Sequence, residues 1–142
     1  MKYSRLIGLV AALALAAPLT ACSDTSVMHM RVGQCILRPE GQTATTIETT
    51  SCTSEHDGEV FFVTSAEDGE FPGESALNKF AEKQCISNFE AYVGKRFVSS
   101  TLDATWMIPT KDSWAQNDRS IVCLAFAMNH SKLKQSVKDS GL

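Results

Sequence analysis

The sequence lacks an apolar run long enough to cross a lipid bilayer. The run at residues 6–18 has 13 residues, whereas a membrane-spanning helix needs about 20. It follows a basic start that contains Lys2 and Arg5, and this order is typical of a secretory signal peptide. We therefore expect residues 1–21 to be a signal that exports the protein, and not a membrane span.

The chain also has little of what common catalytic and metal motifs require. It contains three histidines, no Gly-x-Ser-x-Gly nucleophile motif and no Cys-x-x-Cys pair, and its cysteine spacings do not resemble a zinc site. Internal repeats and low-complexity tracts are absent as well. The sequence therefore predicts no cofactor, no metal site and no catalytic constellation.

Basic residues are too few and too dispersed for a nucleic-acid surface. The chain has 13 Lys and Arg against 16 Asp and Glu. Removing residues 1–21 takes Lys2 and Arg5 but no acid, so 121 residues remain with 11 basic and 16 acidic side chains, a net charge of −5. This length suits one domain, and the acidic charge makes the domain a poor candidate for binding nucleic acid or an anionic lipid surface.

The apolar run ends in a lipidation signal. Leu19-Thr20-Ala21-Cys22 resembles the lipobox of bacterial lipoproteins. The resemblance implies cleavage before Cys22 and a diacylglyceryl thioether, with fatty acids such as palmitate, on its sulfur. Each buried methylene contributes about 0.8 kcal/mol, and two acyl chains anchor stably where one does not. We expect a lipoprotein on the extracytoplasmic face of the cell membrane; an ordinary secretory signal with Cys22 nearby by chance is the alternative.

Four cysteines remain once Cys22 carries lipid. An even number in an exported protein predicts two disulfides, and three pairings are open. We favour Cys35–Cys52 and Cys85–Cys123. These close loops of about 18 and 39 residues, worth roughly 3 and 4 kcal/mol in the chain-entropy model.

The hydrophobic pattern predicts one α+β domain over residues 31–142, after a short tether of residues 22–30. Apolar residues at spacings of three and four predict a long helix over residues 75–93, with Ser75 as its N-cap and Gly94 after its end. An antiparallel sheet of about five strands is expected to pack against this helix. The strands are expected at residues 32–37, 44–51, 59–65, 102–108 and 120–127, with a last edge strand at 131–137.

A set of short motifs identifies the chain more closely. They are Gly33-Gln34-Cys35, the segment from Cys52 to Val60, Phe71-Pro72-Gly73-Glu74, Cys85 with Tyr92-Val93-Gly94, the segment from Pro109 to Trp114, and the segment from Asp118 to Cys123. Together they resemble the septum-formation family, small cysteine-bearing extracytoplasmic domains of actinobacterial envelope proteins, over residues 31–137. Trp106-Met107 is a departure from the family's usual pattern. The resemblance implies a membrane-linked module associated with cell division, and it implies no catalytic residue and no ligand.

The densest polar cluster is Glu55-His56-Asp57-Gly58-Glu59. Three interpretations of His56 are open: a structural hydrogen bond to the backbone near Cys52, a binding site shared with Asp57, or a metal or acid–base centre. We favour the structural interpretation, because no second histidine stands at ligand spacing nearby and the cluster precedes a strand, where polar side chains often cap turns.

Two tryptophans and one arginine are further candidates for binding. Trp106 alternates with other inward residues and is expected in the core, whereas Trp114 has polar neighbours and suits either the core or a groove for peptide or glycan. Asp118-Arg119 suits a solvated turn pair of small energetic value, with a partner-docking role for Arg119 as the alternative.

These patterns favour a non-enzymatic, lipid-anchored module that binds an envelope protein in septum formation or cell-wall processes. The alternative from a different class is a small envelope hydrolase or metal-dependent enzyme that uses His56. A sensor or ligand scavenger is a third hypothesis, and it requires a concave apolar pocket.

Overall fold

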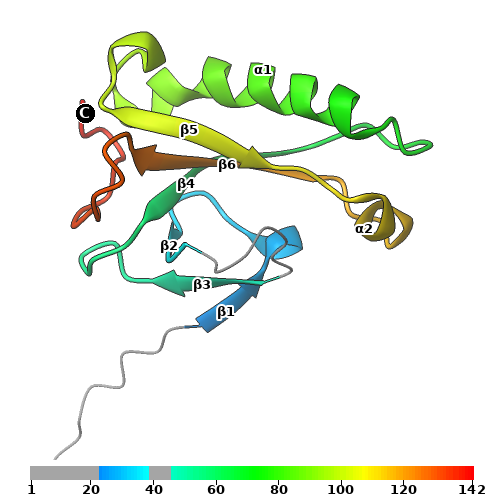
Figure 1. The fold of residues 1–142 in the computed structure, drawn as a ribbon, viewed down its shortest axis with the longest axis horizontal. Helices are drawn as coiled ribbons and strands as arrows, with labels where there is room; N and C mark the ends of the chain where they lie inside the picture. The colour runs from blue at the N-terminus through cyan, green and yellow to red at the C-terminus, as the bar shows by residue number, and fades with distance from the viewer. Residues whose placement is uncertain (1–22, 39–45) are drawn as a thin grey trace, which may run out of the picture.

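The fold is one curled antiparallel sheet with a long helix packed on one face (Figure 1). The computed structural model describes residues 23–38 and 46–142, so the predicted signal peptide, the lipobox and Cys22 lie outside the described residues. The strands follow the order β1-β3-β2-β4-β6-β5 across the sheet. They are β1 (Ser23–Ser26), β2 (Cys35–Ile36), β3 (Thr46–Thr50), β4 (Gly58–Ser65), β5 (Leu102–Met107) and β6 (Ser120–Ala127).

The predicted α+β class is confirmed, with one long helix and two disulfides. Within the described residues the sheet has six strands instead of about five, because Ser23–Ser26 pair with β3. A short 3-10 helix, η1 (Val27–His29), follows β1, and Met30 is buried at 5% exposure. The chain therefore enters the fold within the segment that we expected to be a tether.

The long helix α1 (Glu74–Val93) has a strictly repeating buried face. Its buried residues stand four apart, which places them in one row along the helix; they are Leu77, Ala81, Cys85, Phe89 and Val93. Gly94 ends the helix at φ 82° as predicted, a left-handed conformation that glycine adopts without penalty. The predicted N-cap is wrong: Gly73 takes that place and Ser75 lies inside the first turn. No helix among the described residues is long and apolar enough to span a bilayer.

Strand β4 contributes to two cores on opposite faces of the sheet. Its pairing with β6 shifts between Val60 and Phe62. At this β-bulge Phe61 is an extra residue of β4 that has no paired residue on β6. Phe61 packs in the core beneath α1. Val60 packs on the other face, where β2, β3 and Met30 close the curl around a second core. Both faces of β4 therefore pack in apolar cores.

Two predicted strands differ in the structure. The one at residues 32–37 shortens to β2, because Gly33 adopts φ 88°, a turn conformation outside the strand region. The last edge strand at residues 131–137 is wrong: this segment makes an isolated bridge between Leu133 and His56. Side-chain hydrogen bonds to Glu59 hold it instead of a strand ladder.

Candidate functional site

The two disulfides have the predicted pairing and brace different parts of the fold. Cys35–Cys52 ties β2 to the loop after β3, with Cα atoms 5.2 Å apart, and Cys85–Cys123 ties α1 to β6, with Cα atoms 5.5 Å apart. Cys85 and Cys123 are each 0% exposed and Cys35 is 1% exposed, while Cys52 is half-buried. Of the four disulfide-bonded cysteines, Cys52 alone therefore has substantial contact with solvent.

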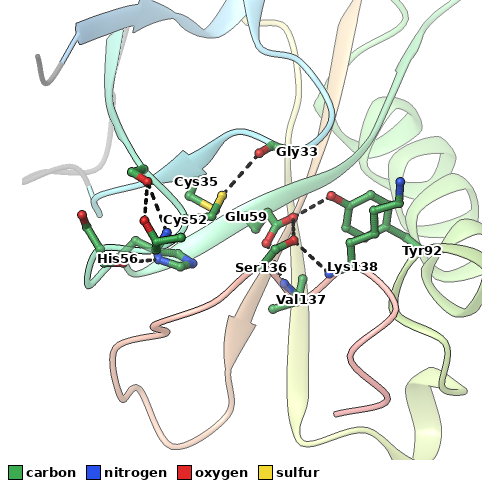
Figure 2. The surroundings of a disulfide bond; sticks show 12 residues. Gly33, Cys35, Cys52, His56, Glu59, Tyr92, Ser136, Val137 and Lys138 are labelled. Atoms are coloured by element: carbon green, nitrogen blue, oxygen red, sulfur yellow. Dashed lines mark hydrogen bonds between the residues drawn. A yellow bond between two sulfur atoms is a disulfide. The ribbon is translucent and has the colours of Figure 1, made fainter.

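Glu59, beside the Cys35–Cys52 disulfide, is a fully buried carboxylate with three hydrogen-bond donors (Figure 2). Tyr92 Oη donates to Oε1 at 2.6 Å, Ser136 Oγ donates to Oε1 at 2.8 Å, and Val137 N donates to Oε2 at 2.7 Å. A buried carboxylate is tolerated only when donors replace its lost water. These contacts join β4, α1 and the C-terminal segment at one point.

Tyr92 is the donor that comes from the helix. The pKa of Tyr92 is raised well above its usual value, first by burial and then by the hydrogen bond to Glu59 and the charge of the Glu59 carboxylate. A phenolate in this place would be both poorly solvated and next to a like charge. The phenol therefore stays protonated at physiological pH and acts as a fixed donor.

His56 occupies the structural position favoured by the sequence. Its side chain is 0% exposed, and Nδ1 lies 2.8 Å from Ser54 O. Its backbone pairs with Leu133 through bonds of 3.0 and 2.8 Å. Nε2 is buried without a hydrogen-bond partner in the described part of the chain. A ring enclosed in this way does not reach a substrate.

One cluster in the described residues has the composition of metal ligands. The ligand atoms of Cys35, Cys52 and Glu59 lie within 4.8 Å of one another. The two sulfurs are joined in a disulfide, however, and a thiolate is the form that coordinates a metal. The oxidised cluster therefore does not fit a metal ion.

Asp57 forms a small ion-pair site next to His56. Its Oδ2 accepts hydrogen bonds of 2.7 Å from both Arg38 N and Lys132 Nζ, and its side chain is 15% exposed. Burial by itself would raise the pKa of Asp57. The hydrogen bonds and positive charges of Lys132 and Arg38 outweigh it and lower the pKa below its usual value. Asp57 therefore fastens the C-terminal segment to the sheet.

Trp114 and Arg119 form a second candidate site at the short helix α2 (Lys111–Ala115). The Arg119 guanidinium lies 3.7 Å from the centroid of the Trp114 ring, a stacked cation–π contact. Arg119 Nη1 also donates to Trp114 O at 3.0 Å and to Asp118 O at 2.8 Å, and Nε lies 3.3 Å from Asp68 Oδ1. Arg119 is thus held by contacts within the fold, although its Nε has no hydrogen-bond partner among the described residues.

Asp118 differs from the solvated turn residue that we expected. It is 5% exposed, accepts from Ser113 Oγ at 2.9 Å through Oδ2, and accepts from Ser120 N at 2.9 Å through Oδ1. Ser113 in turn exchanges bonds with Thr110 in a capping box, which fixes the first turn of α2. The carboxylate therefore locks α2 onto the start of β6.

The structure places Trp114 in the core, one of the two environments left open, and leaves Trp106, expected in the core, half-buried against two core clusters. Trp106 is half-buried and donates from Nε1 to Asn78 Oδ1 at 3.0 Å. Trp114 is 6% exposed, packs edge-on to Phe71 and donates from Nε1 to Gly69 O at 3.0 Å. Trp114 therefore belongs to a core, although one side of it closes the groove described next.

A groove of about 480 Å³ lies between α2, the start of α1 and the loop that joins β4 to α1. We call it the acidic groove. Figure 1 shows this loop and α2 at the same end of the molecule, away from the C-terminus. The floor of the acidic groove is apolar and consists of Leu77, Phe80 and Trp114. Its rim carries the carboxylates of Glu67, Asp68 and Glu70.

The candidate residues taken from the sequence do not form one site. His56 and Asp57 precede β4, while Arg119 bonds to the residue after β4, Ala66, through a 2.8 Å backbone contact. Eight residues of strand span about 26 Å. His56 and Asp57 therefore lie at one end of the sheet, and Trp114 and Arg119 at the other.

The contact between Glu59 and Tyr92 is not evident from the sequence pattern. The one signal was a glutamate at the beginning of a strand whose two faces are apolar. A carboxylate in such a place needs donors from elsewhere in the chain, but the pattern does not say which segments supply them.

A family model described as septum formation matches residues 17–138. No curated protein matches the chain, and no solved structure matches it.

Proposed function

Because the chain belongs to the septum-formation family, we propose that it is a lipid-anchored extracytoplasmic module that binds a protein partner in septum formation or linked cell-wall processes. The family gives the association with the septum and the envelope. The lipid anchor, the partner and the non-enzymatic role are the parts that we add.

The proposed location rests on two features of the chain. Leu19-Thr20-Ala21-Cys22 resembles a lipobox, and two acyl chains on Cys22 would anchor the protein without a membrane span. The domain also carries two disulfides, which persist in oxidising extracytoplasmic compartments and are rare in the cytosol.

The observation that favours binding over catalysis is the enclosure of the most polar motif. His56 and Glu59 are each 0% exposed, so the residues best suited to acid–base chemistry face the interior. A catalytic base must come within hydrogen-bond reach of its substrate. The surface, and above all the acidic groove, is what remains for recognition.

The enzyme alternative makes a different prediction for His56→Ala. Removing a buried ring that binds Ser54 O should lower the free energy of unfolding, as expected for a structural residue. An envelope hydrolase would instead lose turnover at an unchanged melting temperature, and this result would favour the enzyme.

The proposed function is tested by crosslinking the protein in growing cells and identifying the captured proteins by mass spectrometry. The matched control is Cys22→Ala, which removes the predicted acylation site. We expect the wild-type chain to capture division or wall-synthesis proteins that Cys22→Ala does not capture. Recovery of the same background set from both would overturn the proposal.

A further inference from the structure

We infer that the acidic groove receives a segment of the partner protein in which an apolar side chain is flanked by Lys or Arg. This inference rests on the proposed function, because it states the chemistry of the partner at one surface of the module. The groove of about 480 Å³ has the size of a small-ligand site. It therefore suits one or two side chains of a peptide and not a whole domain.

The floor of the groove is apolar and is already in place. Trp114 Nε1 donates to Gly69 O at 3.0 Å, so the indole fixes the loop that forms the opposite wall. Leu77 is 2% exposed, while Phe80 is half-buried and offers its ring to an incoming side chain. Apolar burial gains about 25 cal/mol per Å², and a floor that needs no ordering keeps more of that gain.

The rim carries negative charge that the fold does not balance. Glu67, Asp68 and Glu70 are exposed, and no Lys, Arg or His is among the residues that line the groove. Asp68 pairs with Arg119. Among residues 23–38 and 46–142, neither Glu67 nor Glu70 has an ion-pair partner.

Arg119 does not neutralise the rest of the rim. Its guanidinium is stacked on Trp114 and bonded to two backbone carbonyls, so it is held at one place beneath the loop. Opposite charges select partners and speed their encounter. An acidic rim therefore selects a cationic segment and disfavours nucleic acid and anionic lipid, while the floor requires an apolar residue between the cations.

The test uses the full-length chain purified in detergent and a labelled peptide, Gly-Lys-Leu-Lys-Phe-Lys-Gly, whose binding is followed by fluorescence anisotropy. We expect the double variant Glu67→Gln/Glu70→Gln to raise the Kd about tenfold, since it removes two rim charges. The matched control is Glu82→Gln/Glu90→Gln, which removes two exposed charges of α1 outside the groove. We expect less than about a twofold change for this control.

A second pair of variants tests the site without removing a charge or a buried side chain. Ala76 is exposed and lines the groove, while Ala91 is exposed on α1 and does not line it. Ala76→Lys places a cation in the groove and should weaken peptide binding about fivefold or more through repulsion. Ala91→Lys should leave the Kd within about twofold.

Comparison peptides test each half of the inference. Replacing the peptide lysines with Glu, or its Leu and Phe with Ser, should abolish or strongly weaken binding. Equal binding of either comparison peptide, equal effects of the groove and control variants, or no binding of the cationic peptide at millimolar concentration would overturn the inference.

Crosslinking in cells separates this inference from the proposed function. Capture of the division or wall-synthesis partner should be lost in Glu67→Gln/Glu70→Gln and kept in Glu82→Gln/Glu90→Gln. Full capture by both variants would overturn the groove assignment while the proposed function stands. Failure of the wild-type chain to capture a partner would overturn the proposed function itself.

Discussion

Tyr92 of α1 donates a 2.6 Å hydrogen bond to Glu59 of β4, across 33 positions of sequence. The same carboxylate accepts from Ser136 and Val137 in the C-terminal segment. One buried charge therefore holds the helix, the sheet and the chain end together. Hydrogen bonds to charged groups are among the stronger ones in proteins, so this point should carry a measurable part of the stability.

Tyr92→Phe tests the contribution of this contact. The substitution removes one donor to a buried carboxylate but keeps the ring, so we expect the free energy of unfolding to fall by about 1.5–3 kcal/mol. Urea unfolding of the oxidised protein measures it. Ser87→Ala, at an exposed position of the same helix, is the control and should change stability by less than about 0.5 kcal/mol. A loss no larger than that of the control would contradict the account.

The raised pKa of Tyr92 gives a stability profile at alkaline pH. The folded-state value lies above the ordinary value of 10.0, so the stabilisation is fully present below pH 10.0 and is lost as the pH rises above it towards the folded-state pKa. Tyr92→Phe should lack this alkaline decline.

Ultraviolet titration of the phenol measures the same shift directly. The chain has two tyrosines, Tyr3 and Tyr92, and Tyr3 lies in the expected signal peptide, so the processed protein carries Tyr92 alone. We expect its ionisation to begin well above pH 10 and to coincide with unfolding. A phenol that titrates reversibly at its ordinary value in the folded protein would show that the bond to Glu59 is not formed in solution.

The lowered pKa of Asp57 gives a profile of opposite sign at acid pH. Its stabilisation is present above the ordinary value of 3.8 and is lost as the pH falls through the lower folded-state value. Lys132→Gln should therefore lower the free energy of unfolding by about 1 kcal/mol at neutral pH. This difference from the wild-type protein should shrink below pH 3.8.

Lys134→Gln is the matched control for this ion pair. Lys134 pairs with Glu55, and both side chains are well exposed, at 72% and 64%, so solvent screening leaves that pair almost no stabilising effect. Chemical unfolding at several pH values compares the two variants. Equal effects of both substitutions at neutral pH would show that the Asp57 pair is no stronger than a surface pair.

The two disulfides should differ in reactivity. Exchange requires a thiolate to reach a sulfur, and Cys52 is half-buried while Cys85 and Cys123 are each 0% exposed. Stepwise reduction of the folded protein, with alkylation and mass spectrometry at each step, should label Cys35 and Cys52 before the other pair. Simultaneous labelling of all four would contradict this order.

Local pattern was sufficient for the elements with long regular periodicity. The apolar spacing over residues 75–93 and the continuous run over residues 120–127 predicted α1 and β6 closely. These features depend on near neighbours in sequence.

The features that sequence analysis missed depend on distant contacts. Hydrogen bonds to Glu59, 77 positions before Ser136, set the conformation of the C-terminal segment. The residues of the segment itself predicted a strand at 131–137 that these described residues do not form. The polar sequence neighbours of Trp114 left its environment open, and the distant loop near Gly69 decides it by covering the ring. Strand alternation gives the face of a side chain and does not say what covers that face.

The state of Cys22 tests the central claim of a lipid-anchored module most directly. Mass spectrometry of the amino-terminal peptide, from protein extracted from the membranes of growing cells, measures it. We predict a chain that begins at Cys22 and carries a diacylglyceryl group on the sulfur. We also predict that the Cys22→Ala variant is absent from the membrane fraction. An unmodified Cys22, or a chain that begins at another residue, would contradict the account.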